Sequence, residues 1–432
     1  MAEIKPFRAL RYTAAAGDIA FLTCPPYDII SEEERQHYLR DNPCNVIRLE
    51  LPKGDEPYAE AGRTLNSWLA RGVLRQDTDP GFYIYEEEFT AYGEKKKVKG
   101  FICLVKLEEF SKGVILPHEE TLSKAKEDRF NLMKATGCNF SQIYSLYMDE
   151  EHSTAKTLDA LSSGRPRYEF FDGSVTHRMW LVNDREAIAS ISADFAGRKL
   201  YIADGHHRYE TALNYRNWRR EQGTATGGED YVMMMLVDMA SEGLVVFPTH
   251  RLVRGLPGGG CLPGFDAEKL LSDCEGLFEI TRYDSLEGIE ETIAKPFSRG
   301  ANAFAFYSGG SGWAQLVLKN ADAMENALPD KSEAYRSLDV SVLHSLILER
   351  LLGIDKENMA NQINLTYTRS LDEALDSVRS GASQCAFLLN PTRVTQIRDV
   401  AAAGEKMPQK STYFYPKLIT GLVMRTMSAP AD

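Results

Sequence analysis

The sequence lacks the features of a membrane protein and of a disulfide-stabilised protein. No apolar run approaches the roughly 18 residues that a membrane-spanning helix needs, and the densest, Tyr231 to Val237, is short. The seven cysteines are scattered and never spaced as C-x-x-C, which disfavours a zinc site or a disulfide framework. The first residues hold no apolar signal core. We therefore expect a cytoplasmic protein with no membrane partner.

Basic residues are also outnumbered by acidic residues. Lysine and arginine number 50 against 62 aspartates and glutamates, which gives a formal net charge of −12. Because nucleic-acid binding depends on lysine and arginine at phosphates, we expect no nucleic-acid partner. A local basic pocket for a small anionic metabolite or nucleotide remains compatible with this charge. The sequence leaves the oligomeric state open.

The composition is that of a folded protein with more than one domain. Of 432 residues, 43% are hydrophobic and 26% are charged, which is enough for a full core. This length predicts about two or three domains. The stretch 256–264 is rich in glycine and proline and is the clearest linker. We predict one domain over residues 1–255, with a minor boundary near residue 165, and a smaller C-terminal α/β domain over 265–432.

Local patterns predict a mixed fold. Ser31 with Glu34 forms a capping box that opens a short helix. Asn45–Leu51 alternates apolar and polar residues, as a half-buried strand does. Residues 81–90 and 97–107 have the pattern of a β-hairpin. The fold class that we predict is α+β or α/β, with mixed sheets in the N-terminal region.

One stretch combines a strand, a glycine turn and a helix start. The apolar run from Leu200 to Ala203 has the length of a strand, and the pattern after Arg208 is helical. The first amides of a helix lack intrahelical partners and lie at the positive end of its dipole, so such a turn can bind an anion. Gly205 permits a ligand to approach the backbone closely. The glycines and lysine of a P-loop and the glycines of a Rossmann motif are absent here.

The side chains of this turn suit phosphate chemistry. Arg208 offers a planar fork for phosphate or carboxylate. His206 and His207 can carry protons near neutral pH or bind phosphate, and Asp204 can hold a metal ion. The alternative interpretation is that Asp204 is only a helix N-cap and that the histidines are ordinary surface residues.

Further polar groups lie outside the turn. His118 and Glu119 follow a proline at the end of the hairpin region, which makes them candidate proton-transfer groups. The charged stretch after them is either a solvated helix or part of a site, and the polar, basic and aromatic loop 407–417 is either a packed connector or a clamp for an anion. The candidate residues for binding a substrate carboxylate or second phosphate are Lys126, Arg129, His250, Arg251 and Lys410.

The turn Asp204–Arg208 resembles the phosphate-binding box of the ParB/sulfiredoxin-like fold. That superfamily includes CTP-hydrolysing partition proteins, ATP-using sulfiredoxins and free-serine kinases, whose box is very similar. Sulfiredoxins carry their reactive cysteine in this box, whereas this sequence has Gly205-His206-His207, so we do not expect thiol chemistry. No helix-turn-helix pattern follows the box, which argues against a role in DNA partition.

More of the chain resembles an uncharacterised prokaryotic family, domain of unknown function 1015. This resemblance implies a ParB/sulfiredoxin-like N-terminal region and small-molecule phosphate metabolism. The matching stretches, which cover nearly the whole chain, are Pro26–Asp28, Asn42-Pro43 with Arg48–Glu50, Pro117–Glu119 with Lys126 and Asp128-Arg129, Tyr201–Glu210, Pro248–Arg251, and Met407-Pro408 with Lys410–Phe414.

Together these features predict kinase- or phosphatase-like phosphoryl transfer on a small hydroxylated metabolite such as serine or phosphoserine. Asp204 to Arg208 would hold phosphate, with ATP, ADP or CTP as the nucleotide and Mg²⁺ at Asp204. Glu119 would act as general base, with His118 as the alternative, and His206 and His207 would neutralise charge. Two other hypotheses stay open: a nucleotide-binding regulatory switch without fast turnover, and a metal-dependent nuclease.

Overall fold

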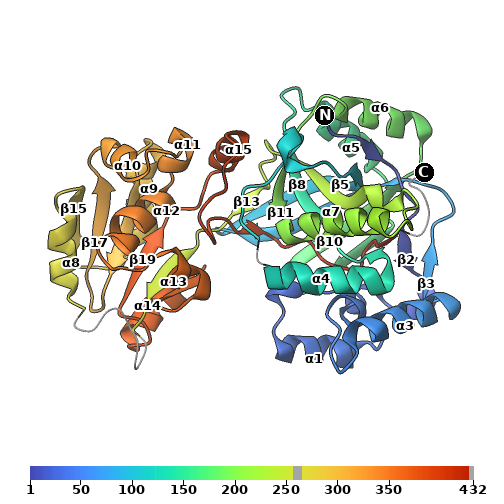
Figure 1. Cartoon of the computed structure of the whole chain (residues 1–432), viewed down its shortest axis with the longest axis horizontal. Helices are drawn as coiled ribbons and strands as arrows, with labels where there is room; N and C mark the ends of the chain where they lie inside the picture. Colours follow the sequence, from blue (N-terminus) through green and yellow to red (C-terminus); the bar gives the residue numbers. More distant parts are fainter. Residues whose placement is uncertain (122, 256–264, 428–432) are drawn as a thin grey trace. The chain divides into compact units, whose positions relative to one another are not determined.

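The computed structural model describes residues 1–121, 123–255 and 265–427 (Figure 1). Over these residues the chain divides into two units, each with its own internal contacts. Unit 1 contains Met1–Pro117, Thr121–Val245 and the chain from Phe414 onward, and unit 2 contains His118–Glu120 and Val246–Tyr413. Both units combine helices with β-sheet, which confirms the mixed α/β class. The predicted linker 256–264 lies outside the described residues.

Unit 1 is built on a mixed β-sheet. Its strands lie side by side in the order β6 (Ile115–Leu116), β11 (Leu200–Asp204), β8 (Ile143–Tyr147), β12 (Tyr231–Asp238), β5 (Glu94–Lys106), β4 (Phe82–Ala91), β10 (Val175–Val182) and β9 (Tyr168–Phe171), and β1 (Ile4–Lys5) pairs with β5. β4 and β5 form the predicted hairpin. β8 is parallel to β12 and antiparallel to β11, so the chain leaves β11 and β12 at opposite ends of β8.

The helices of unit 1 pack against this sheet and against a second buried cluster. They are α1 (Glu32–Asp41), α2 (Ile47–Glu50), α3 (Pro57–Ala70), α4 (Ser123–Thr136), α5 (Ser153–Leu161), α6 (Arg185–Phe195) and α7 (His206–Glu221). Tyr209 and Leu213 of α7 and Phe195 of α6 share one buried cluster with Ile202 and Leu236 of the sheet. Figure 1 shows α4 and α7 side by side. The predicted capping box of Ser31 and Glu34 opens α1.

The predicted strand over Asn45–Leu51 is wrong. The segment forms the single helical turn α2 instead. The side chain of Asn45, which is fully buried, accepts from the amide of Ile47 and donates to two backbone carbonyls. Residues 46, 47, 49 and 50 are all buried, so burial does not follow the alternation that suggested a strand. A local side-chain-to-backbone bond therefore outweighs the period-2 pattern.

The end of the chain, from Phe414, belongs to unit 1, whereas the sequence predicts one domain over 265–432. The amide of Met424 and the carbonyl of Leu10 are 3.0 Å apart, and the amide of Thr420 donates to the carbonyl of Cys24 at 2.8 Å. β21 (Arg425–Thr426) pairs with β7 (Cys138–Asn139). Backbone pairing between such distant segments leaves no local pattern in the sequence, so the boundary could not be placed from composition.

Unit 2 contains a second sheet with a core on each face. Alternate residues of β16 separate the cores: Phe304 and Phe306 lie in one buried cluster, and Ala305 and Tyr307 lie in the other. Its strands lie in the order β15 (Phe278–Tyr283), β17 (Trp313–Leu318), β16 (Ala303–Tyr307), β19 (Cys385–Leu389), β14 (His250–Val253) and β18 (Leu365–Thr368). Its helices are α8 (Ala267–Cys274), α9 (Ile289–Ser298), α10 (Asp322–Ala327), α11 (Glu333–Arg336), α12 (Asp339–Val342), α13 (Lys356–Asn361), α14 (Leu371–Arg379) and α15 (Val394–Ala402).

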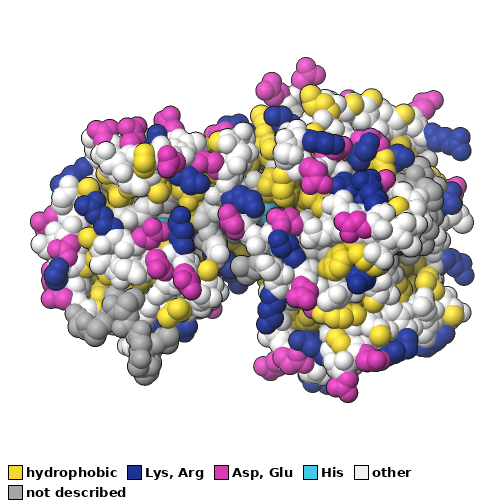
Figure 2. Space-filling model, viewed as in Figure 1, with side chains coloured by type: hydrophobic (Ala, Val, Ile, Leu, Met, Phe, Trp, Pro, Cys, Tyr) yellow, Lys and Arg dark blue, Asp and Glu magenta, His cyan; other side chains and the backbone are white. Residues whose placement is uncertain are grey.

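Two features that the composition bears on are the apolar character of the helices and the distribution of charge on the surface. Among the described helices, none has the length and apolar character needed to cross a membrane. On the face shown in Figure 2, basic and acidic side chains are interspersed rather than gathered by sign.

A chain of polar side chains is buried in the sheet of unit 1. The hydroxyl of Tyr85 lies 2.9 Å from Oε1 of Glu87 and 2.7 Å from Nδ1 of His177, whose Nε2 lies 2.9 Å from Asp172. Glu87, Tyr85 and His177 are at most 1% exposed. Oε2 of Glu87 has no hydrogen-bond partner among the described residues. Burial therefore raises the pKa of Glu87 to about 8.

This burial makes the stability of the protein depend on pH. Because the folded-state pKa of Glu87 exceeds its ordinary value of 4.5, ionisation above that value favours the unfolded chain, and stability present below pH 4.5 is lost as the pH rises towards 8. We expect Glu87→Gln to change the free energy of unfolding little at pH 5 and to raise it at pH 8, by on the order of 3 kcal/mol. Urea denaturation at both pH values measures this, with the exposed Glu242→Gln as control. An equal effect of Glu87→Gln at both pH values would contradict the prediction.

Candidate functional site

The Asp204–Arg208 turn has the predicted strand–turn–helix form. β11 ends at Asp204, and α7 begins at His206. Gly205 occupies the N-cap position with a φ of +95°, so Asp204 is not the N-cap. A Cβ at Gly205 would lie 3.0 Å from the guanidinium of Arg208. Glycine is therefore needed here both for the left-handed backbone and for the space into which Arg208 folds back.

Asp204 and Arg208 hold each other in place. Nη2 of Arg208 lies 2.8 Å from Oδ2 of Asp204, and Nη1 donates to the carbonyl of Gln142 at 2.5 Å. Oδ1 of Asp204 accepts from Nζ of Lys417 at 2.6 Å. All three charged side chains are at most 21% exposed. The turn is thus a cluster of one carboxylate and two cations, and direct ligation of Mg²⁺ by Asp204 would require one of these cations to withdraw.

The two histidines differ in their surroundings. His206 is 2% exposed and is therefore not a surface residue, whereas His207 is partly exposed. Solvent therefore reaches residue His207 more readily than His206.

A second charged group in unit 1 surrounds Arg129. Its guanidinium donates to the backbone carbonyl of Glu50 at 2.6 Å and pairs with Asp128 at 2.6 Å. The ring of Tyr27 lies 4.1 Å from the guanidinium carbon. The carboxylate of Glu50 accepts from the hydroxyl of Ser141 at 3.0 Å. Burial raises the pKa of Glu50, and the positive charge of Arg129 opposes that rise.

One cavity connects these two groups. It has a volume of about 40 Å³, and its lining includes Arg208 and Thr211 of α7, Arg129 of α4, Glu50 of α2 and Ser141. Segments around Glu50, from Arg129 to Ser141, and from Arg208 to Thr211, which are far apart in the sequence, therefore meet at one point of unit 1. Lys126 lies in the same unit, where its ammonium pairs with Glu210 of α7 at 2.7 Å.

The predicted proton-transfer residues His118 and Glu119 belong to unit 2. Their common neighbour is Thr412, whose hydroxyl lies 3.0 Å from Nε2 of His118 and donates to Glu119 at 3.2 Å. His118 is fully buried, and its carbonyl accepts from the amide of Met407. His118 and Glu119 are thus neighbours of the 407–412 motif within unit 2.

Arg251 forms most of its hydrogen bonds with the backbone of unit 2. It is 1% exposed, and its guanidinium donates to the carbonyls of Thr249, Gln409 and Lys410 and to His344. These bonds fix the loop that contains Lys410. The neighbouring His250 accepts from the amide of Leu389, and burial lowers the pKa of His250 to about 4.

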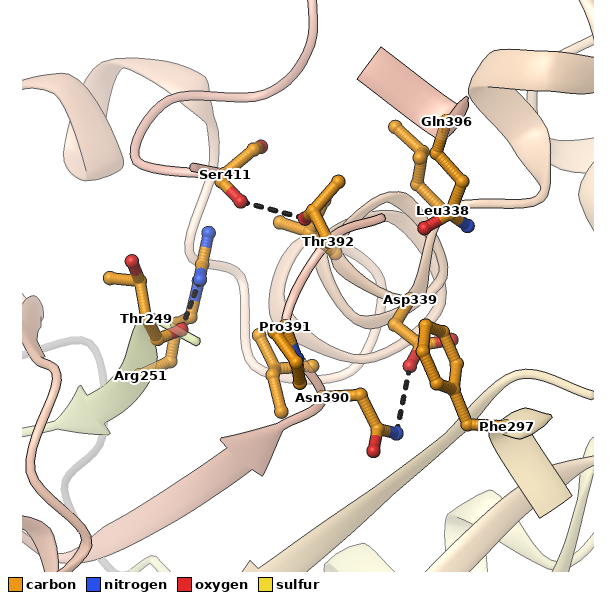
Figure 3. A pocket seen from close by; sticks show the side chains of 12 residues that line it. Thr249, Arg251, Phe297, Leu338, Asp339, Asn390, Pro391, Thr392, Gln396 and Ser411 are labelled. Carbon is orange, nitrogen blue, oxygen red and sulfur yellow. Dashed lines mark hydrogen bonds between the residues drawn. The ribbon is translucent and has the colours of Figure 1, made fainter. Parts of the chain in front are cut away.

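The space beside Arg251 is small. Figure 3 shows it from close by, with Arg251 directed to Thr249 on one side and the hydrogen-bonded pair Asp339 and Asn390 on the other. Its volume is about 10 Å³, which suffices for about one water molecule. Arg251 is therefore placed to support the loop rather than to bind a phosphate.

Sequence reasoning gives no role to Glu50 and does not identify the partner of Lys417. Glu50 belongs to one of the stretches that resemble the family domain of unknown function 1015, and the predicted strand that contains it is instead the helical turn α2. Lys417 was considered only as part of a loop that clamps an anion, whereas its ammonium lies on Asp204. The signal that pointed to Lys417 was the basic and aromatic composition of 407–417; nothing local indicated its partner.

No curated protein sequence matches the chain. Solved structures are similar to parts of it, and they include the following three. A conserved hypothetical protein from Pyrococcus furiosus is 14% identical, with 72% of this chain and 90% of that chain covered and a TM-score of 0.34. A free serine kinase in complex with AMP is 13% identical, with 72% and 86% covered and a TM-score of 0.36. SbnI with a C-terminal truncation from Staphylococcus aureus is 11% identical, with 74% and 86% covered and a TM-score of 0.36.

The sequence also matches a family model, over residues 4–341. That range includes the turn at Asp204, the Arg129 group and the Glu87 network. The chain therefore belongs to the family described as protein of unknown function (DUF1015).

Proposed function

We propose that the protein binds the phosphate of a small anionic metabolite or nucleotide at the Asp204–Arg208 turn and transfers a phosphoryl group to or from a hydroxylated metabolite. The observation that carries the proposal is the cavity beside this turn, which Arg208 and Arg129 both line. Serine or phosphoserine as the metabolite, and ATP, ADP or CTP as the nucleotide, are the specific members of these classes that we propose from the resemblance of the box.

The backbone of the turn supplies one part of an anion site. α7 runs for 16 residues from His206, and its first amides follow directly on a glycine in the left-handed conformation. The positive end of the helix dipole and these amides favour negative charge at that point. Because Gly205 carries no side chain, a phosphate oxygen can approach the backbone closely.

The side chains supply the second part. Lys417 and Arg208 converge on the carboxylate of Asp204, which occupies the position of an anion between two cations. A phosphate that enters would compete with Asp204 for the same donors. Arg208 can offer two parallel N–H groups to a phosphate, and each charge-assisted bond is stronger than a neutral one. Phosphoryl transfer depends mainly on such positioning and charge neutralisation.

Proton transfer needs a separate group. Within this proposal Glu119 is the general base that accepts the proton of the substrate hydroxyl, and His118 is the alternative. The hydroxyl of Thr412 contacts both side chains, so it would hold their orientation within unit 2.

Removal of Arg208 tests the binding step. We expect Arg208→Ala to weaken the binding of ATP, ADP, CTP or phosphoserine, whichever binds the wild type, by about tenfold to a hundredfold, because a charge-assisted hydrogen bond contributes about 1.5–3 kcal/mol. Isothermal titration calorimetry measures the affinity and thermal melting checks the fold. Arg220→Ala is the matched control, since Arg220 is exposed at the far end of the same helix. Unchanged affinity of a folded Arg208→Ala would refute the site.

Replacement of Glu119 tests the chemical step. With ATP and serine, or with phosphoserine and ADP, we expect Glu119→Gln to lower kcat about 10²-fold or more while the nucleotide Kd stays unchanged, since a general base acts only on the transition state. Glu120→Gln, an exposed neighbour, is the control. A loss of affinity without a loss of kcat would contradict the assignment. Binding without any turnover in the wild type would instead favour a regulatory switch.

A further inference from the structure

A larger cavity lies in unit 1 at the carboxyl ends of the parallel strands β8 and β12. Its volume is about 340 Å³, within the range of small-molecule sites. Tyr147 ends β8 and Asp238 ends β12, and the two residues are direct partners in the sheet. The carboxyl ends of parallel strands are a common place for ligands to bind.

This cavity is separate from the turn at Asp204. In the pairing of β11 with β8, Asp204 lies opposite Tyr144 and Leu200 lies opposite Tyr147. The two polar sites therefore lie at opposite ends of β8, and the residues that line one do not line the other.

A histidine and a buried aspartate face this cavity together. Nδ1 of His152 lies 3.0 Å from Oδ2 of Asp238, whose Oδ1 accepts from the amide of Ala240 at 3.0 Å. Asp238 is 5% exposed, whereas the side chain of His152 is 50% exposed. Both oxygens of Asp238 are thus engaged, and Asp238 fixes the ring so that Nε2 of His152 is the nitrogen left to act on a ligand.

The backbone of His152 is held in an unfavourable conformation. Its φ is +53°, in the left-handed region, at the position that precedes α5. Glycine adopts this conformation readily, whereas a residue with a side chain is strained in it. A histidine at this position therefore lowers the stability of the backbone conformation. Its side chain provides the contact with Asp238, which glycine would not provide.

Three lysines and two aspartates line the cavity, so the lysines outnumber the aspartates by one. Lys99 pairs with Asp159 at 2.7 Å and with Glu86 at 3.2 Å. Lys97 lies at the longer distances of 3.4 and 3.6 Å from Glu86 and Glu88. In the described structure the ammonium of Lys156 donates to the backbone carbonyl of Glu151 rather than to a carboxylate. Lys156 and Lys97 are therefore the cations best able to accept an anionic ligand.

We propose that this cavity is a second binding site, for a small metabolite that carries a carboxylate or phosphate group. Lys156 and Lys97 bind the oxyanion, and His152, oriented by Asp238, forms a hydrogen bond to the same ligand through Nε2. This second site does not depend on phosphate binding at Arg208, so an experiment can refute either proposal without refuting the other.

Nuclear magnetic resonance of the His152 ring tests the site directly. The probes are inorganic phosphate, succinate and phosphoserine, each titrated to about 10 mM, a range that detects Kd values near 1 mM. We expect at least one probe to shift the His152 signal with saturation. The Arg208→Ala variant should give the same shift, because it alters only the other site. No shift with any probe would overturn the proposal.

Two variants distinguish a binding residue from a structural one. His152→Gly relieves the left-handed conformation, so we expect its melting temperature to equal or exceed that of the wild type while probe binding, followed by calorimetry, falls at least tenfold. Lys156→Ala should weaken binding at least threefold, whereas Lys112→Ala, an exposed lysine of unit 1 outside the cavity, should not. Undiminished binding by His152→Gly and Lys156→Ala would also overturn the proposal.

Discussion

The carboxylate of Asp204, held between the cations of Arg208 and Lys417, is the contact on which the arrangement of unit 1 most depends. These charges are largely shielded from water, and a charge in such a place is costly unless it is paired. The pairing joins the turn before α7 to a segment 213 residues later in the chain. It therefore connects the proposed phosphate site to the C-terminal segment, which backbone pairing of β21 with β7 also holds in unit 1.

The buried residues Arg129 and Arg251 have the same side chain but different roles, one beside a cavity and the other in support of a loop. Arg129 pairs with Asp128 and contacts Glu50, and it lines a cavity beside Arg208. Arg251 has backbone carbonyls as its main partners, and these hold the loop at residues 409–410. A guanidinium beside a cavity can exchange one partner for a ligand, whereas one surrounded by carbonyls stabilises a loop.

The topology of the sheet separates the polar sites of unit 1. Because β11 is antiparallel to β8 and β12 is parallel to it, Asp204 and Asp238 come to lie at opposite ends of β8. Each aspartate ends a strand, and each orients a neighbouring group: Arg208 in one case and His152 in the other. One sheet thus positions two charged clusters without contact between them, which lets each be altered alone.

The sequence by itself determined the elements whose signals are local. The β11–turn–α7 unit, the β4–β5 hairpin and the capping box of α1 follow from patterns within a few residues, and all are present. The alternation in Asn45–Leu51 predicts a strand, but the segment forms a helical turn because a side-chain bond of Asn45 to the backbone overrides that alternation. Tertiary structure alone decided that Lys417 pairs with Asp204, that Glu50 joins Arg129, and that His152 meets Asp238. Such contacts depend on strand order and on the burial of charge, and a single sequence records neither.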